Sequence, residues 1–234
     1  MQNPLPPEVA RQWDDVYRAK FNTMWYPHED IVRFCTRYIQ KRLTYDSYDV
    51  KRRVERVLDL GCGNGRHVVM FARQGFQVSG IDISERAIEW AAGWCRREGL
   101  SCDLRVGDIA QLPYADASFD VVVTHGVLDH VRIEQAQQAV SEVHRALKPG
   151  GLFYCDLRST EDFECGTGEE VEPHTYLLKD GFEAGLVQHF FSLDEAQALL
   201  KGLFRILNIE CSDRRIAPDF TRRYSRWAVA SERV

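Results

Sequence analysis

The chain has 234 residues, of which 44% are hydrophobic and 28% charged, and its formal net charge is −5. This composition is typical of a soluble globular protein with a sizeable core, and the negative charge argues against a general attraction to nucleic acid or acidic membranes. The sequence has no apolar run close to the roughly 20 residues that span a bilayer, and its start lacks the pattern of a signal peptide. Seven scattered cysteines without a Cys-x-x-Cys pair favour reduced thiols, so we expect a cytoplasmic protein without a metal site.

The N-terminal part, residues 8–43, has the periodicity of helices. One helix begins near Trp13, and apolar residues spaced by three and four over residues 31–39 indicate a second. Residues 44–53 are polar and are predicted to be a linker. We therefore expect residues 1–53 to form N-terminal helices ahead of the first strand.

Strand and helix patterns then alternate, which predicts βαβ units and a parallel sheet. Apolar runs predict strands near residues 55–60, 76–82, 102–107, 119–125 and 151–157. Helical periodicity between these runs predicts helices near residues 65–74, 84–98 and 132–147. Ser84 is suited to cap the second of these helices, and Pro149-Gly150-Gly151 marks the end of the third.

The alternation is interrupted over residues 158–187, where the stretch from Glu161 to Glu172 holds six carboxylates and no basic residue. It resumes with a predicted helix over 194–201 and predicted strands near 204–211 and 223–231. We expect one domain over residues 1–234. Its parts are the N-terminal helices (1–53), a core (54–157), an insertion (158–190) and a C-terminal helix with strands (191–234).

The most informative segment is Asp59–His67, in which an apolar strand runs into glycines at positions 61, 63 and 65. Glycine permits a sharp turn from strand to helix and leaves room for a ligand against the backbone. The helix N-terminus that follows has unpaired N–H groups, which favour a carboxylate or another anion. Asp59 adds a negative charge suited to an ammonium group, unless it only caps the helix. A ligand with both charges is an amino acid or a cofactor with an amino-acid tail.

Two other glycine-rich sites fit this loop poorly. The dinucleotide fingerprint requires glycine at its first, third and sixth positions, and the sixth position counted from Gly61 is Arg66. A P-loop would end in Gly-Lys-Ser/Thr, which the segment lacks. A dehydrogenase is therefore a distant alternative.

Polar residues also follow the next predicted strands. Open parallel sheets bind ligands beyond the carboxyl ends of their strands. Asp82 comes 17 residues after Gly65, about where an acid that binds ribose hydroxyls is found. Asp108 ends the third strand and can accept from an exocyclic amine, with Ile83 and Ile109 packing against the ring faces.

These residues resemble the class I S-adenosylmethionine-dependent methyltransferases over about residues 54–157. Asp59-Leu-Gly-Cys-Gly-Asn-Gly65 is similar to the motif that holds the methionine end of the cofactor, and Asp82 is similar to the ribose-binding acid. The resemblance implies a doubly wound, mostly parallel, seven-stranded α/β sheet (Rossmann-like) with an antiparallel last strand and an N-terminal helical lid. It also implies S-adenosylmethionine as cofactor. The expected cofactor-binding residues are Asp59, Gly61, Cys62 (through its backbone), Gly63, Gly65, His67, Asp82, Ile83, Asp108, Ile109 and His125.

Residues for the acceptor side are less clearly indicated. Asp129 and His130 follow the fourth strand, where the family often places substrate groups, and His189 follows the insertion that often covers the site. We treat these three as candidate catalytic residues, although each also fits a structural role as a cap or a packed side chain. Four aromatic residues of the N-terminal part are candidates for a lid over the substrate: Trp13, Tyr17, Trp25 and Tyr26.

The sequence therefore predicts an enzyme that transfers a methyl group to an oxygen or nitrogen of a small molecule. Eight Lys or Arg against three acids between Arg33 and Arg56 leave an RNA or protein methyltransferase as an alternative. A non-catalytic protein that binds S-adenosylmethionine is a third reading. Nucleic acid and membrane are not expected partners, and the chain is expected to be a monomer or a homodimer.

Overall fold

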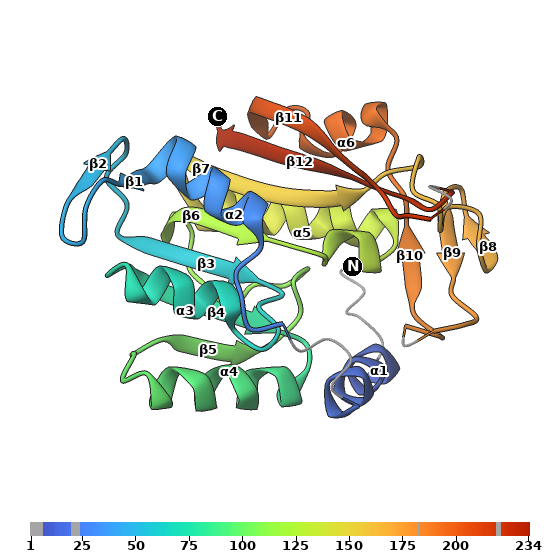
Figure 1. Ribbon diagram of the computed structural model, residues 1–234, viewed down its shortest axis with the longest axis horizontal. Coiled ribbons are helices and arrows are strands. Elements are labelled where there is room, and N and C mark those ends of the chain that lie inside the picture. Colours follow the sequence, from blue (N-terminus) through green and yellow to red (C-terminus); the bar gives the residue numbers. More distant parts are fainter. Residues whose placement is uncertain (1–6, 20–23, 182, 219–220) are drawn as a thin grey trace.

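A seven-stranded sheet forms the centre of the computed structural model, which describes residues 7–19, 24–181, 183–218 and 221–234 (Figure 1). The strand order is β11-β12-β7-β6-β3-β4-β5. These strands are β3 (Arg56–Leu60), β4 (Gln77–Asp82), β5 (Asp103–Val106), β6 (Phe119–Thr124), β7 (Leu147–Arg158), β11 (Phe204–Arg215) and β12 (Arg223–Arg233).

The sheet is mostly parallel, as predicted. β3 pairs in parallel with β4 and β6, and the outer pairs β4–β5 and β6–β7 are also parallel. The last strand, β12, inserts antiparallel between β7 and β11. The chain reverses its winding direction between β3 and β6, which creates the topological switch point where open α/β sheets bind ligands.

Helices cover both faces of the sheet, which confirms the doubly wound fold. α2 (Glu29–Phe34), α3 (Arg66–Arg73) and α4 (Glu85–Arg97) contribute to one core cluster, in which Val57 and Val68 are fully buried. α5 (Ile133–Ala146) and α6 (Leu193–Leu200) contribute to the cluster on the other face, with Leu58 and Leu60. Alternate residues of β3 therefore enter opposite cores, as the two-residue period of a strand requires.

Two segments contain more strand than the sequence predicted. A hairpin of β1 (Gln40–Arg42) and β2 (Tyr48–Val50) follows a π-helical turn at Cys35–Ile39. β1 lies in the segment predicted to be helical (8–43), and β2 lies in the predicted linker (44–53). The insertion contains an antiparallel sheet of β8 (Glu169–Glu172), β9 (Thr175–Leu177) and β10 (Val187–His189). Strands this short, with mostly polar residues, lack the alternation on which the prediction depended.

Helix α1 (Pro7–Arg18) lies at the carboxyl end of the sheet (Figure 1). Asp14 Oδ1 accepts hydrogen bonds from Ser84 Oγ (2.5 Å) and from the Arg86 backbone N–H (3.1 Å), both at the start of α4. Gln12 Nε2 donates to the Gly185 carbonyl of the insertion at 3.2 Å. α1 thus connects the cofactor half of the predicted site with the insertion.

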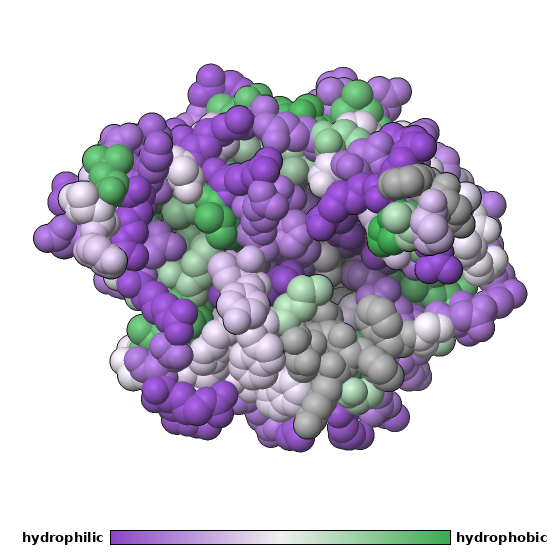
Figure 2. All heavy atoms as spheres, viewed as in Figure 1, coloured by the Kyte–Doolittle hydropathy of each residue, from purple (hydrophilic) through white to green (hydrophobic). Residues whose placement is uncertain are grey.

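The face in Figure 2 is mostly hydrophilic, and its hydrophobic side chains lie in small separate areas. One such area is the β1–β2 hairpin, where Leu43 and Val50 are exposed. Among the described residues, no helix is long and apolar enough to cross a membrane.

Candidate functional site

A cavity of about 250 Å³ lies at the switch point between β3 and β6. Its walls come from α1, the glycine loop, the carboxyl ends of β4 and β6, and residues of β7, β12 and the insertion. The lining residues are Val9, Trp13, Tyr17, Met24, Gly61, Cys62, Gly63, Asn64, Arg66, His67, Asp82, Ile83, Ile109, His125, Gly126, Val127, His130, Val131, Arg158, Glu183 and Arg226.

The glycine loop is built around left-handed backbone positions. Gly61, Gly63 and Gly65 have φ angles of +68°, +53° and +89°, which side-chain-bearing residues rarely adopt. A Cβ on Gly63 would lie 2.5 Å from Tyr17 Oη, and a Cβ on Gly61 would overlap the Val127 side chain. Both positions require glycine because other parts of the cavity wall approach the bare backbone.

Asp82 fixes this loop from the end of β4. Its Oδ2 accepts from the Gly63 N–H at 2.8 Å, and its Oδ1 accepts from the Ser84 N–H at 2.9 Å. Burial raises the pKa of Asp82 to about 6, although both backbone hydrogen bonds oppose the shift. The carboxylate therefore lines the cavity and retains lone pairs beyond the two in use.

Asp59 lies behind the loop and next to His67. The His28 backbone N–H donates to His67 Nε2 at 3.1 Å, so His67 carries its proton on Nδ1, 3.8 Å from Asp59 Oδ1. The other carboxylate oxygen, Asp59 Oδ2, is buried without a hydrogen-bond partner. An unpaired buried oxygen of this kind can accept from an ammonium group or a water molecule.

His125, at the middle of the cavity, is held neutral. Arg66 Nη2 donates to its Nδ1 at 3.2 Å, which leaves the proton on Nε2, 3.5 Å from Asp156 Oδ2. Burial, followed by the nearby His28 and Arg226, lowers the pKa of His125 well below its usual value.

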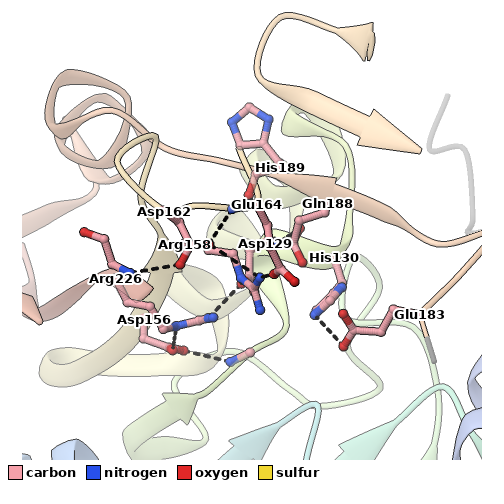
Figure 3. Close-up of polar contacts among 12 residues, drawn as sticks. Asp129, His130, Asp156, Arg158, Asp162, Glu164, Glu183, Gln188, His189 and Arg226 are labelled. Carbon is pink, nitrogen blue, oxygen red and sulfur yellow. Dashed lines mark hydrogen bonds and ion pairs between the residues drawn. The ribbon is translucent and has the colours of Figure 1, made fainter. Parts of the chain in front are cut away.

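A buried ion-pair cluster forms the opposite end of the cavity (Figure 3). Arg226 of β12 donates through Nε to Asp156 Oδ2 (2.5 Å) and through Nη2 to Asp129 Oδ2 (2.7 Å). Burial lowers the pKa of Arg226, but the two carboxylates outweigh it and the net shift is upward. Burial raises the pKa of Asp129, but the ion pair with Arg226 outweighs burial, so the net shift is downward. Arg158 of β7 lies beside this cluster, with its Nε 4.0 Å from Asp129 Oδ2.

His130, in the turn after β6, and Glu183, in the insertion, face each other in the cavity wall. His130 Nε2 lies 3.7 Å from Glu183 Oε1, and Nδ1 is buried without a partner. Trp13 of α1 packs against the His130 ring edge to face, with centroids 5.1 Å apart. One histidine is therefore fixed between the helix and the insertion.

Most predicted site residues line the cavity, and several do not. Gly65 packs on α4, and Asp59 lies one layer behind the wall. Asp108 accepts from the Ala110 N–H at 2.8 Å. Asp129 is fully buried behind Arg226.

The remaining predicted residues point elsewhere. His189 accepts from or donates to Thr175 Oγ1 at 2.7 Å, and its ring points away from the ion-pair cluster (Figure 3). Trp25 packs on Trp94, and Tyr26 is 85% exposed.

The sequence analysis missed four charged residues of the cavity lining: Arg66, Arg158, Glu183 and Arg226. Asp156 and Arg226 interrupt apolar strands, and a charge in a buried strand requires a partner. That signal would have pointed to a buried pair, but not to its position at the cavity.

S-adenosylmethionine combines an ammonium, a carboxylate, ribose hydroxyls and an adenine ring. The cavity lining offers the start of α3, the Asp82 carboxylate and the apolar side chains of Ile83 and Ile109, and the unpaired Asp59 oxygen lies one layer behind it. The residues present therefore fit this cofactor.

Part of the chain is similar to known methyltransferases. Residues 58–155 match the methyltransferase domain family. The chain is 38% identical to sterol 24-C-methyltransferase of Gibberella zeae over 162 residues, which cover 66% of this chain and 40% of that protein. It is 39% identical to the ubiquinone biosynthesis O-methyltransferase of Maricaulis maris over 101 residues, covering 43% of this chain and 39% of that protein.

The chain spans about half the length, or less, of the curated relatives it matches. A S-adenosylmethionine-dependent methyltransferase from Methanosarcina mazei has the same fold, with a TM-score of 0.68 at 22% identity over 89% of this chain and 99% of that one. The matched segment contains the glycine loop, Asp82 and Asp108. Residues 58–155 are therefore similar to the methyltransferase domain family, and the chain has the fold of a S-adenosylmethionine-dependent methyltransferase.

Proposed function

We propose that the protein transfers the methyl group of S-adenosylmethionine to an oxygen or nitrogen of a small-molecule acceptor. The observation that carries this proposal is the single cavity that joins Asp82 at one end to His130, Arg158 and Arg226 at the other. A cofactor site and a separate polar region share one enclosed space, as a group-transfer reaction requires.

The cofactor-binding assignment follows the layout of the cavity. Asp82 would accept from the ribose hydroxyls, while Ile83 and Ile109 would pack against the adenine. The backbone of Gly61–Gly63 and the start of α3 would hold the amino-acid end, with Asp59, His67 and His125 behind it. Asp108 would contact the adenine from the turn after β5, as the family resemblance implies.

The cofactor supplies a methyl group on a sulfonium, which is already a good leaving group. The chain's own residues align the acceptor and exclude water. The rate acceleration from alignment alone can be large, since effective molarities of about 10⁵–10⁸ M are known for well-oriented intramolecular reactions. Trp13 and Tyr17 of α1 close one wall, which supports the predicted lid role for these two residues. Trp25 and Tyr26 lie outside the lining and are not assigned to it.

His130 is the best placed of the three catalytic candidates. It lines the cavity, and the Glu183 carboxylate near Nε2 would stabilise the imidazolium formed when the ring takes a proton from the acceptor. Asp129 would act as a positioning residue through Arg226. His189 is assigned a structural role, because it bonds to Thr175 within the insertion.

The alternatives receive less support. Arginines of the basic segment form ion pairs with acids, including Arg33 with Glu29, Arg37 with Glu210 and Arg52 with Glu232. This pairing reduces the charge available to RNA phosphates. The name of the sterol relative specifies a carbon acceptor and that of the ubiquinone relative an oxygen acceptor, so similarity alone does not choose the acceptor atom.

Calorimetric titration with S-adenosylmethionine, S-adenosylhomocysteine and NAD tests the proposal. We expect micromolar binding of the two adenosyl compounds and none of NAD. Asp82→Ala should weaken adenosyl binding by about tenfold or more, or about 1.4 kcal/mol. The matched control is Asp103→Ala, since Asp103 is an exposed acid on the neighbouring β5. Binding of NAD without either adenosyl compound would overturn the proposal.

A further inference from the structure

We propose that the acceptor carries a carboxylate, or an anion of similar shape, that binds to Arg158 and Arg226 at the β7–β12 end of the cavity. This inference rests on the proposed function, because the bound anion would be part of the molecule that accepts the methyl group. It adds a substrate class, which neither the family nor the cofactor site specifies.

The first support is the orientation of the charges. Both guanidinium groups line the cavity, whereas their partners Asp129, Asp156 and Asp162 do not. These three acids are 0%, 2% and 4% exposed and lie next to the arginines (Figure 3). Glu183 also lines the cavity, beside His130, so a ligand that reaches Arg158 and Arg226 meets these side chains before the three buried acids but passes close to Glu183.

The second support is the number of unused donors. A guanidinium has five N–H donors, and the protein bonds of Arg226 use Nε and Nη2. Arg158 donates through Nη1 to Glu164, and its buried Nε lies 4.0 Å from Asp129 Oδ2. The unused donors of Arg226 are therefore the main source of hydrogen bonds for an acceptor oxygen at this end of the cavity.

The acids also hold the arginines in place. Asp156 Oδ1 accepts from the Gly126 N–H at 2.7 Å, and Asp162 accepts from the Ser225 N–H at 2.9 Å, so both are fixed by the backbone. Arg226 is thereby oriented before the ligand binds, which reduces the entropy lost on binding. Planar, bidentate recognition of a carboxylate is the interaction that arginine provides and lysine does not.

The acids around this site outnumber the two arginines, so a bound anion is also repelled by nearby negative charges. Asp162 has its pKa raised by burial, and Glu164 is partly exposed, with 38% of its side chain accessible. The favourable free energy of the hydrogen bonds between an anion and the two arginines must exceed the repulsion from Glu183 in the cavity wall and from the carboxylates one layer further back. If they do not, a neutral or cationic group should bind better, and the experiment distinguishes these outcomes.

The test uses pairs of small probes that differ only in charge: benzoate with benzamide and benzylamine, and butyrate with butyramide. Each is titrated by NMR into the full chain saturated with S-adenosylhomocysteine. We expect at least one carboxylate to bind about tenfold more tightly than its amide, equivalent to about 1.4 kcal/mol. Equal or tighter binding of the amides or of benzylamine, or no binding of either carboxylate, would overturn the proposal.

Substitutions then locate the site. Arg158→Gln should weaken carboxylate binding about tenfold and leave the affinity for S-adenosylhomocysteine unchanged, whereas Arg158→Lys should retain part of the carboxylate affinity. The matched control is Arg205→Gln, because Arg205 is 65% exposed and pairs with Glu232 outside the cavity. Unchanged carboxylate binding in a folded Arg158 variant contradicts the inference. Failure of S-adenosylhomocysteine itself to bind the wild type would instead contradict the proposed function.

Discussion

Single residues determine whether the glycine loop can form. Gly65 and Gly75 have the same φ of +89°, but their surroundings differ. A Cβ on Gly65 would lie 2.8 Å from Ala91 Cβ of α4, whereas a Cβ on Gly75 would meet nothing within 4 Å. The surroundings of Asp82 act on its charge instead, because burial raises the pKa of its carboxyl group.

Gly65→Ala and Gly75→Ala separate backbone strain from packing. Both substitutions place alanine in the left-handed region, which costs about 1–2 kcal/mol. Only Gly65→Ala also pushes α3 away from α4, and overpacking adds about 1–3 kcal/mol. Urea unfolding should show a clearly larger loss of free energy for Gly65→Ala. Equal losses would mean that the contact with Ala91 is unimportant.

Asp82 predicts how cofactor affinity depends on pH. Burial raises the pKa of Asp82 to about 6, so the ligand-free protein favours the protonated form below that pH. Hydroxyl donors of a bound ribose stabilise the ionised form. Affinity for S-adenosylhomocysteine should therefore rise between pH 5 and pH 7 and then level off. In Asp82→Asn the affinity should be lower, and this rise should be absent; calorimetry across the pH range measures both.

Among the elements, α1 shows how a helix outside the central sheet completes the site. Its residues Trp13 and Tyr17 line the cavity, and its attachment to α4 depends on Asp14. The helix itself could be predicted from its periodicity. Its docking position could not, because Asp14 and Ser84 are 70 residues apart and form their bond only in the folded chain.

Asp14→Ala should loosen α1 without unfolding the sheet. The substitution removes the acceptor for Ser84 Oγ and for the Arg86 N–H, each hydrogen bond being worth about 0.5–1.5 kcal/mol. Hydrogen exchange in residues 7–18 should become faster, and affinity for S-adenosylhomocysteine should fall several-fold. Asp15→Ala is the control, because Asp15 is exposed and its side chain pairs with Arg18. The same exchange rates in both variants would argue against docking through Asp14.

At the scale of the whole molecule, the cluster around Arg226 connects distant parts of the chain. Arg226 of the antiparallel β12 bonds to Asp156 of β7 and to Asp129 of the 3₁₀ turn Leu128–His130 after β6. Asp129 and Arg226 are 97 residues apart. The strand that completes the sheet therefore also supplies one end of the cavity.

Arg226→Gln should be strongly destabilising. It leaves two buried carboxylates unpaired, and breaking a buried ion pair costs about 3–5 kcal/mol. Arg226 outweighs burial and keeps the pKa of Asp129 low, so this contribution is present above the unfolded pKa of about 3.9 and is lost as pH falls below it.

Without Arg226, burial and the nearby Asp156 raise the pKa of Asp129, and only the weaker effects of His130 and Arg158 oppose them. The difference in unfolding free energy between wild type and variant should therefore narrow from pH 7.5 to pH 5, as urea unfolding can measure. The exposed control Arg205→Gln should change stability by about 1 kcal/mol or less at either pH. A pH-independent difference would show that Asp129 does not titrate in the variant.

The sequence by itself determined the alternating core, the glycine loop and the acid at the end of β4, since each depends on local spacing that a strand or a turn imposes. It also identified His130, Trp13 and Tyr17 as candidates, but not which of the seven catalytic and lid candidates face the cavity. The tertiary structure decided that selection, and it brought Arg158, Glu183 and Arg226 to the same space. These residues come from β7, the insertion and β12, and only the pairing of β12 beside β7 and the docking of α1 place them together. Local patterns encode which elements form, whereas contacts between distant segments depend on how those elements pack.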